Sequence, residues 1–221
     1  MKTFVKTIIL LLLGFTFVAT TTFAAKDNKA DKTQKKIEKQ AKTIAKNYQK
    51  EGYAVSGTVL PLEQVVLNHL QKLQDSRYLD YETKVSAPTY AIGQQKCLGD
   101  AQNFMVRLVF DSVRYRYDQA YGGDEVRKNK KEVSWTDRFF SAFQQVGAID
   151  LGGMIHPSFT IYKKEKRSDL TEYRMFFLYN SDFINSNRQA ITHAIQQALK
   201  EVEEGTEFGE KVQKFINNGL K

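Results

Sequence analysis

The sequence predicts an α+β fold in which helices cover a small, mostly antiparallel sheet of about three strands. Segments 159–162 and 173–179 are rich in aromatic and β-branched residues, and a polar run at 163–169 separates them. This pattern is typical of an antiparallel strand pair. Apolar residues then recur at three- and four-residue steps, at Ile191, Ala194, Ile195, Ala198, Leu199 and Val202. We expect this stripe to belong to a long helix that covers the sheet.

The other elements follow from local patterns. Helices are predicted over 33–51, 62–74, 94–117, 135–146 and 208–216, and a strand over 80–92 that is interrupted at Pro88. Residues 113–117 also alternate like a strand, but the longer periodic run favours the helix. Loops are expected at 53–59 and 121–133, with a flexible stretch at 149–157 and a helix stop at Gly147.

Residues 1–24 have the parts of a secretory signal peptide. Lys2 and Lys6 precede an apolar run at 8–19, and small residues lie before an expected cleavage site after Ala24. The run is shorter than the roughly 20 residues that span a bilayer, which favours a cleaved signal over an anchor helix. We therefore expect an exported protein, periplasmic or extracellular. A bacterial lipoprotein would need a cysteine at the cleavage site, and because the only cysteine is Cys97 we do not expect a lipoprotein.

The positive charge is concentrated near the N-terminus. The full chain carries a formal net charge of +8. Residues 26–51 contain nine lysines and four acidic residues, whereas residues 52–221 are nearly balanced. We therefore predict a basic helical segment at 25–52, with residues 26–32 disordered, and a single α+β domain at 53–221. A nucleic-acid-binding surface would spread over a folded face, so a nucleic-acid partner is not expected.

Two groups of basic residues are candidates for contact with an anionic surface. The first group lies on one side of the N-terminal helix, opposite its apolar residues, and comprises Lys35, Lys39, Lys42 and Lys46. The second lies in the predicted loop at 121–133 and comprises Arg127, Lys128, Lys130 and Lys131. The alternative for the helix is that a thin apolar seam docks it on the domain and its lysines face solvent. The small alanines in that seam favour docking over insertion into a membrane.

The sequence contains none of the common motifs for nucleotide binding, catalysis or metal binding. There is no Gly-rich phosphate loop, GxSxG, HExxH, CxxC or calcium-loop spacing. The only histidines, His69, His156 and His193, offer few bases for a nucleophile, and Cys97 falls on an apolar helical stripe. We therefore expect a protein that is not an enzyme, with no cofactor and no bound metal.

Two further patterns leave alternatives open. Asp137, Asp150 and Asp182 could serve a glycan hydrolase that uses paired carboxylates, although no spacing brings two of them together. The segment 114–117 alternates arginine and tyrosine, as in surfaces that stack on single-stranded nucleic acid or sugars. Arginine packed on tyrosine at a helix end would give the same sequence.

Short motifs and the order of the elements suggest a family. The lysine-rich helix ends in KEGY at 50–53, LPLE at 60–63 begins a second helix, and a strand leads through Gly93 into a long helix before a final hairpin and helix. In this order the chain resembles small secreted envelope proteins of Gram-negative gut bacteria, distantly similar to twenty-kilodalton envelope lipoproteins. The resemblance implies an exported α+β domain without known enzymatic activity. The chain departs from the lipoproteins in lacking a cysteine at the cleavage site.

These observations predict a non-catalytic exported protein that binds or organises a component of the cell envelope, such as an anionic lipid, a glycan or a protein partner. The alternatives are the glycan hydrolase and a structural envelope protein that self-associates. No transmembrane segment is expected after cleavage of the signal.

Overall fold

The computed structural model describes residues 26–121, 130–166, 168–200 and 207–220, so the predicted signal peptide lies outside the described residues. The chain divides into two compact units, 1–38 and 39–221. In the first unit the described residues form the beginning of helix α2 (Lys26–Lys50). This helix starts at Lys26, within the stretch for which disorder was expected. The predicted division between a basic segment and a domain near residue 52 stays a prediction.

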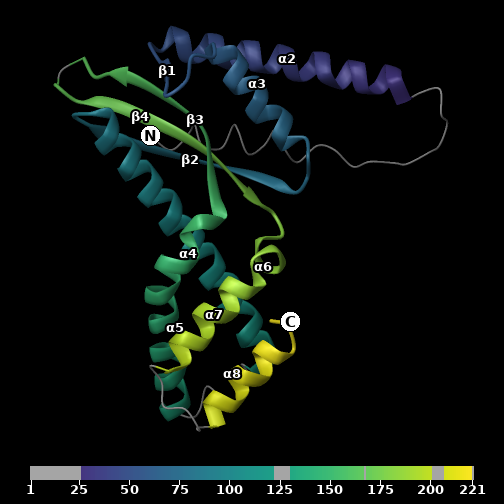
Figure 1. The fold of residues 1–221 in the computed structure, drawn as a ribbon, viewed down its shortest axis with the longest axis vertical. Helices are drawn as coiled ribbons and strands as arrows, with labels where there is room; N and C mark the ends of the chain where they lie inside the picture. The colour runs from purple at the N-terminus through teal and green to yellow at the C-terminus, as the bar shows by residue number, and fades with distance from the viewer. Residues whose placement is uncertain (1–25, 122–129, 167, 201–206, 221) are drawn as a thin grey trace. The chain divides into compact units, whose positions relative to one another are not determined.

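The second unit contains the end of α2 and all later elements (Figure 1). In chain order these are β1 (Ala54–Ser56), α3 (Leu62–Leu73), β2 (Tyr78–Ala87), α4 (Tyr90–Tyr121), α5 (Lys130–Asp150), the short 3₁₀ helix η2 (Gly152–Met154), β3 (Ile155–Lys164), β4 (Thr171–Asn180), α6 (Phe183–Ser186), α7 (Arg188–Lys200) and α8 (Glu207–Asn217).

The α+β class is confirmed, with seven α-helices and one four-stranded antiparallel sheet in the described residues. The strand order is β1-β3-β4-β2. The predicted hairpin is confirmed as β3 and β4, with Tyr162 opposite Tyr173. Strand β2 ends at Ala87, directly before Pro88, which cannot donate a hydrogen bond to a strand ladder. The prediction that the strand continues to residue 92 is wrong, because α4 begins at Tyr90.

The fourth strand, β1, falls in the region predicted as a loop. Its three residues pair with residues 160–162 of β3. Three residues are too few to show an alternating pattern, so only the pairing reveals the strand. The turn before it depends on Gly52, which has a φ of +86° that residues with a Cβ rarely adopt.

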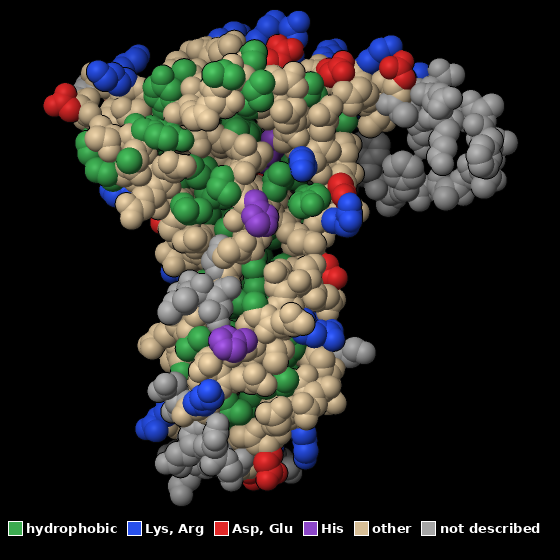
Figure 2. All heavy atoms as spheres, viewed as in Figure 1, with side chains coloured by type: hydrophobic (Ala, Val, Ile, Leu, Met, Phe, Trp, Pro, Cys, Tyr) green, Lys and Arg blue, Asp and Glu red, His purple; other side chains and the backbone are tan. Residues whose placement is uncertain are grey.

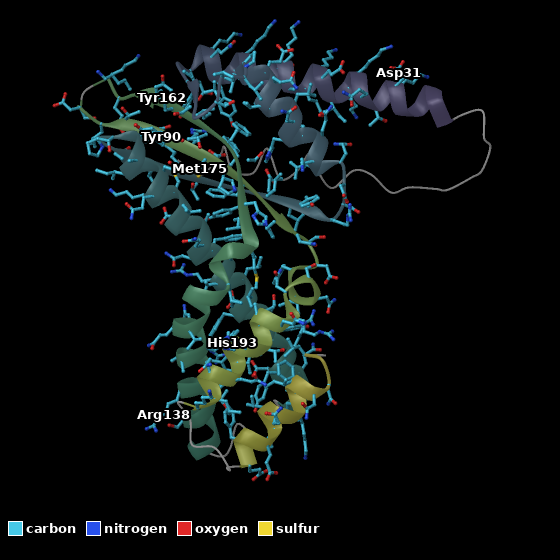
Figure 3. All side chains as sticks on the ribbon, viewed as in Figure 1. Asp31, Tyr90, Arg138, Tyr162, Met175 and His193 are labelled. Carbon is cyan, nitrogen blue, oxygen red and sulfur yellow. The ribbon has the colours of Figure 1, made fainter. Side chains whose placement is uncertain are left out.

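Different helices cover the two faces of the sheet. Met175, Phe177 and Tyr179 of β4 join the larger core cluster with residues of α4, and Figure 3 labels Met175 on β4. Phe176 joins Phe159 and Ile161 of β3 in a second cluster, together with α3 and the part of α2 from Ala41 onward. Alternate side chains along β4 thus point to opposite faces of the sheet and belong to two separate apolar cores.

The stripe on α7 is buried as predicted, but it does not cover the sheet. Ile191, Ala194, Ile195 and Ala198 are fully buried, and α7 packs mainly against α5, while α4 is the helix with the largest contact with β2 and β4 (Figure 1). Periodicity identifies the buried side of a helix without identifying what covers it. Val202 lies outside the described residues.

Several predicted boundaries around α5 are wrong. The helix begins at Lys130 and continues to Asp150, so residues 130–133 are not a loop and Gly147 does not end the helix. A Cβ on Gly147 would lie 3.0 Å from Leu151 Cδ1, so this glycine permits close packing. Residues 155–157, predicted to be flexible, begin β3. By contrast, residues 113–117 are helical as predicted, within α4.

Candidate functional site

Part of the predicted lysine surface lies on the second half of α2. Ala41 and Ala45 are 0% and 2% exposed, and they pack in one cluster with Leu62 and Val66 of α3. Residues on the opposite side of the helix therefore face solvent.

Lys39, Lys42 and Lys46 are exposed on that outer side. We call these three residues the lysine face. Figure 2 shows Lys and Arg side chains along α2, with acidic side chains between them. Among the residues that the structure describes, no ion pair involves a lysine of this face. Three positive charges on one helix are thus available to an external anion.

The other predicted contact residues are not part of this face. Lys35 belongs to the first unit, where its Nζ lies 2.9 Å from Asp31 Oδ2, with both side chains largely exposed. Arg127 and Lys128 lie outside the described residues. Lys130 and Lys131 form the start of α5, and their side chains are outside the description.

A charged cluster around Glu172 was not predicted from the sequence. Glu172 on β4 is 8% exposed, and Lys84 Nζ lies 2.8 Å from its Oε2. Arg174 Nε and Lys163 Nζ lie 3.4 Å and 3.8 Å from its Oε1. The Tyr53 hydroxyl donates a hydrogen bond to the same oxygen. Since several donors surround the carboxylate, its negative charge is compensated although it is buried.

The aromatic rings of Tyr48 and Tyr53 complete this cluster. The guanidinium of Arg174 lies 4.9 Å from the ring centroid of Tyr53 and 6.0 Å from that of Tyr48. The Arg174 Nη1 atom also lies 3.4 Å from Glu82 Oε1. Both tyrosines are close to the end of α2, so the cluster ties this end of the helix to the sheet.

The surroundings shift the pKa values of the acidic groups in this cluster. Burial raises the pKa of the Glu172 carboxyl, but hydrogen bonds from Lys84 and Tyr53 outweigh it and hold the pKa below its ordinary value. Burial, followed by the negative charge of Glu82, raises the pKa of Tyr48 to about 12. Burial and the hydrogen bond to Glu172 raise the pKa of Tyr53.

The raised pKa values of Tyr48 and Tyr53 predict alkaline destabilisation. The folded chain holds the Tyr48 proton more tightly than the unfolded chain does, so the stabilisation is complete below a pH of about 10 and is lost as the pH rises towards 12. We expect urea unfolding, followed by circular dichroism, to show a falling free energy of unfolding across this range. Tyr48→Phe should reduce the slope. An equal slope in the wild-type chain and Tyr48→Phe would contradict the prediction.

His69 lies in the core at the meeting point of α3, β2 and β3. Its Nδ1 is 2.9 Å from Ser158 Oγ, and its Nε2 is 3.9 Å from Asp80 Oδ2. The ring is 5% exposed and packs edge-on against Phe159 and Phe176. A distance of 3.9 Å is too long for a hydrogen bond, so Asp80 does not orient the ring as the carboxylate of a catalytic triad does. We interpret Ser158 as the partner that satisfies a buried imidazole.

The remaining chemical candidates from the sequence are dispersed. Asp137 Oδ1 lies 3.6 Å from Arg114 Nη2, and Asp182 accepts a hydrogen bond from Asn185. The side chain of Asp150 is outside the description. His156 lies on β3 and His193 on α7, where Figure 3 labels it. Cys97 is fully buried on α4, as the apolar stripe predicted.

Neither a metal site nor a membrane span is apparent in the described part of the chain. Within residues 26–121, 130–166, 168–200 and 207–220, no group of three or more His, Cys, Asp or Glu residues could hold a metal ion. No helix in the same residues is long and apolar enough to cross a membrane.

The helices and the four-stranded antiparallel sheet define an α+β protein. No family model, no curated protein and no solved structure matches this chain.

Proposed function

We propose that this chain is a non-catalytic exported protein that binds or organises an anionic component of the cell envelope through the lysine face of α2. The observation that carries the proposal is the exposure of Lys39, Lys42 and Lys46 on the side of the helix that faces away from its packing seam. Export is supported by the signal-like residues 1–24.

The packing of α2 favours attraction at a surface over insertion into one. The apolar side of this part of the helix is already buried in the domain, with Ala41 and Ala45 in contact with α3 and the sheet. An inserted amphipathic helix needs a free apolar face. The lysines instead offer charge alone, which attracts phosphate or carboxylate groups and weakens as salt rises.

The proposal is tested by replacing Lys39, Lys42 and Lys46 together with glutamine. A lysine near an anionic membrane surface contributes about 1 kcal/mol, so binding to anionic lipid vesicles at low salt should weaken by about 100-fold. Cosedimentation with vesicles, isolated peptidoglycan or acidic polysaccharide would measure the loss and identify the preferred polyanion. Point substitutions are preferable to deletion of the helix, because Ala41 and Tyr48 support the domain core.

A matched control removes the same charge from other elements. Lys96, Lys200 and Lys214 are exposed on α4, α7 and α8, and their replacement by glutamine gives the same net charge as the first variant. The control should bind nearly as the wild-type chain does. If both variants lose affinity equally, overall charge explains the binding, and if neither does, the lysine face has no role.

A further inference from the structure

The two edges of the sheet differ in how they are protected against pairing with another strand. At one edge, β1 covers only residues 160–162 of β3. The remaining part of β3 contains Pro157 and a register shift between Pro157 and Phe159. A short edge strand, a proline and a bulge are the devices by which proteins prevent sheet edges from associating.

The other edge, formed by β2, has none of these three devices. Its ten residues pair with β4 from Tyr78 to Ala87 without a register shift and contain neither proline nor glycine. In an antiparallel strand, alternate residues direct both N–H and C=O away from the neighbouring strand. Among the described residues, no hydrogen bond joins the outward backbone groups of residues 79–87 to another segment. This edge therefore offers a regular row of unpaired backbone groups.

We propose that β2 pairs antiparallel with β2 of a second copy of this chain, so that the two sheets become continuous. The two-fold axis passes through Thr83. In this register Glu82 lies opposite Lys84 of the second copy, and the symmetry produces this pair twice. Tyr81 lies opposite Val85, also twice. Opposite charges and aromatic with β-branched residues are favourable cross-strand pairs.

The charges on β2 select this register over its neighbours. Shifting the axis to Glu82 places the two Glu82 side chains opposite each other, although Lys84 then lies opposite Asp80 twice. Shifting it to Lys84 places two lysines opposite each other, so only the register about Thr83 combines opposite-charge pairs with no like-charge pair. Like charges directly opposite are destabilising. Charged residues on an edge strand usually oppose association. Here, in one register, Glu82 and Lys84 of one copy each face a residue of opposite charge on the other copy. Charge complementarity thus points to a second copy as the occupant of the edge.

The side chains involved are accessible from the edge. The side chains of Glu82 and Lys84 are 34% and 51% exposed, and they pair within one copy with Arg174 and Glu172. Both lie on the face of the sheet opposite to Tyr81, which stacks on Phe104 of α4. Antiparallel pairing about a two-fold axis perpendicular to the sheet keeps Glu82 and Lys84 of both copies on one face and Tyr81 and Val85 of both copies on the other.

The proposed pairing through β2 is independent of the proposed binding of α2 to an anionic surface.

Crosslinking between two cysteine variants tests the register. Glu82→Cys and Lys84→Cys chains are mixed and treated with a mild oxidant or a short thiol crosslinker, and the native Cys97 is fully buried. We expect a covalent dimer that contains one chain of each kind, at about tenfold higher yield than either variant gives alone. Predominant self-crosslinking of one variant would overturn the register, and absence of crosslinks in every mixture would overturn pairing through β2.

Sedimentation of the full chain at several concentrations tests the association itself. Lys84→Glu places like charges opposite each other at two positions, so the dissociation constant of the dimer should rise about tenfold. The double variant Glu82→Lys/Lys84→Glu restores the opposite charges between the copies and should recover most of the affinity. Because it also breaks the ion pairs with Arg174 and Glu172 within each copy, circular dichroism and urea unfolding must show that each variant is folded. A wild-type chain that stays monomeric up to its solubility limit would overturn the proposal.

Discussion

Replacing Phe177 with alanine is expected to lower the free energy of unfolding by about 3–5 kcal/mol. Phe177 is fully buried at the centre of β4, opposite Tyr81 of β2 and Pro157 of β3. Its ring belongs to the core cluster that joins the sheet to α4. Truncation removes buried apolar surface and leaves a cavity that surrounding backbone in a paired strand cannot readily fill.

Urea denaturation followed by circular dichroism would measure this loss. Tyr115→Ala provides the control, because it also removes an aromatic ring but from a side chain that is 64% exposed on α4. The control should stay within about 0.5 kcal/mol of the wild-type chain. A loss for Phe177→Ala no larger than that of the control would mean that the core between β4 and α4 is not formed in solution.

Long periodic segments made the class of fold predictable from the sequence. The strand pair β3–β4 followed from aromatic and β-branched runs with a polar turn between them. In α4, residues 113–117 satisfied both a helical and an alternating pattern. The helix prevails because Val109, Val113 and Tyr117, each four residues apart, are all buried on one side of it.

The features that were predicted wrongly depend on tertiary contacts, which local sequence patterns do not reveal. Strand β1 has three residues and exists through its pairing with β3, which local sequence does not encode. Gly147 resembles a helix stop, but Leu151 needs the space that its missing side chain leaves. The α7 stripe showed a buried face, and only the fold shows that α5 covers it.

In the candidate site, too, local sequence patterns predicted some features, whereas contacts between residues distant in sequence were not predictable. The exposure of Lys39, Lys42 and Lys46 followed from helical periodicity alone. The cluster around Glu172 joins Tyr53, Lys84 and Lys163, which are far apart in the chain and carry no shared motif. The one available signal was the placement of Glu172 and Arg174 within a strand otherwise rich in aromatic residues.

Gly93→Ala is expected to destabilise the fold by about 1–3 kcal/mol, even though alanine is the better helix former. A Cβ at this position of α4 would lie 2.3 Å from Cδ2 and 2.8 Å from Cγ of Tyr173 on β4. Tyr173 is itself buried, and the clash reaches the root of its ring, so a small rotation does not relieve it. Either α4 must move away from the sheet or the ring must leave its position.

Thermal and urea unfolding of Gly93→Ala and Gly99→Ala would separate the clash from helix propensity. Gly99 lies in the same helix, and a Cβ there meets nothing within 4 Å, so Gly99→Ala should stabilise the chain by about 0.5–1 kcal/mol. Replacing Tyr173 with leucine should cost less in the Gly93→Ala chain than in the wild-type chain, because the smaller side chain removes the overlap. Equal stabilisation by both alanine substitutions would mean that Gly93 is not in close contact with Tyr173, and that α4 lies further from β4 than the structure shows.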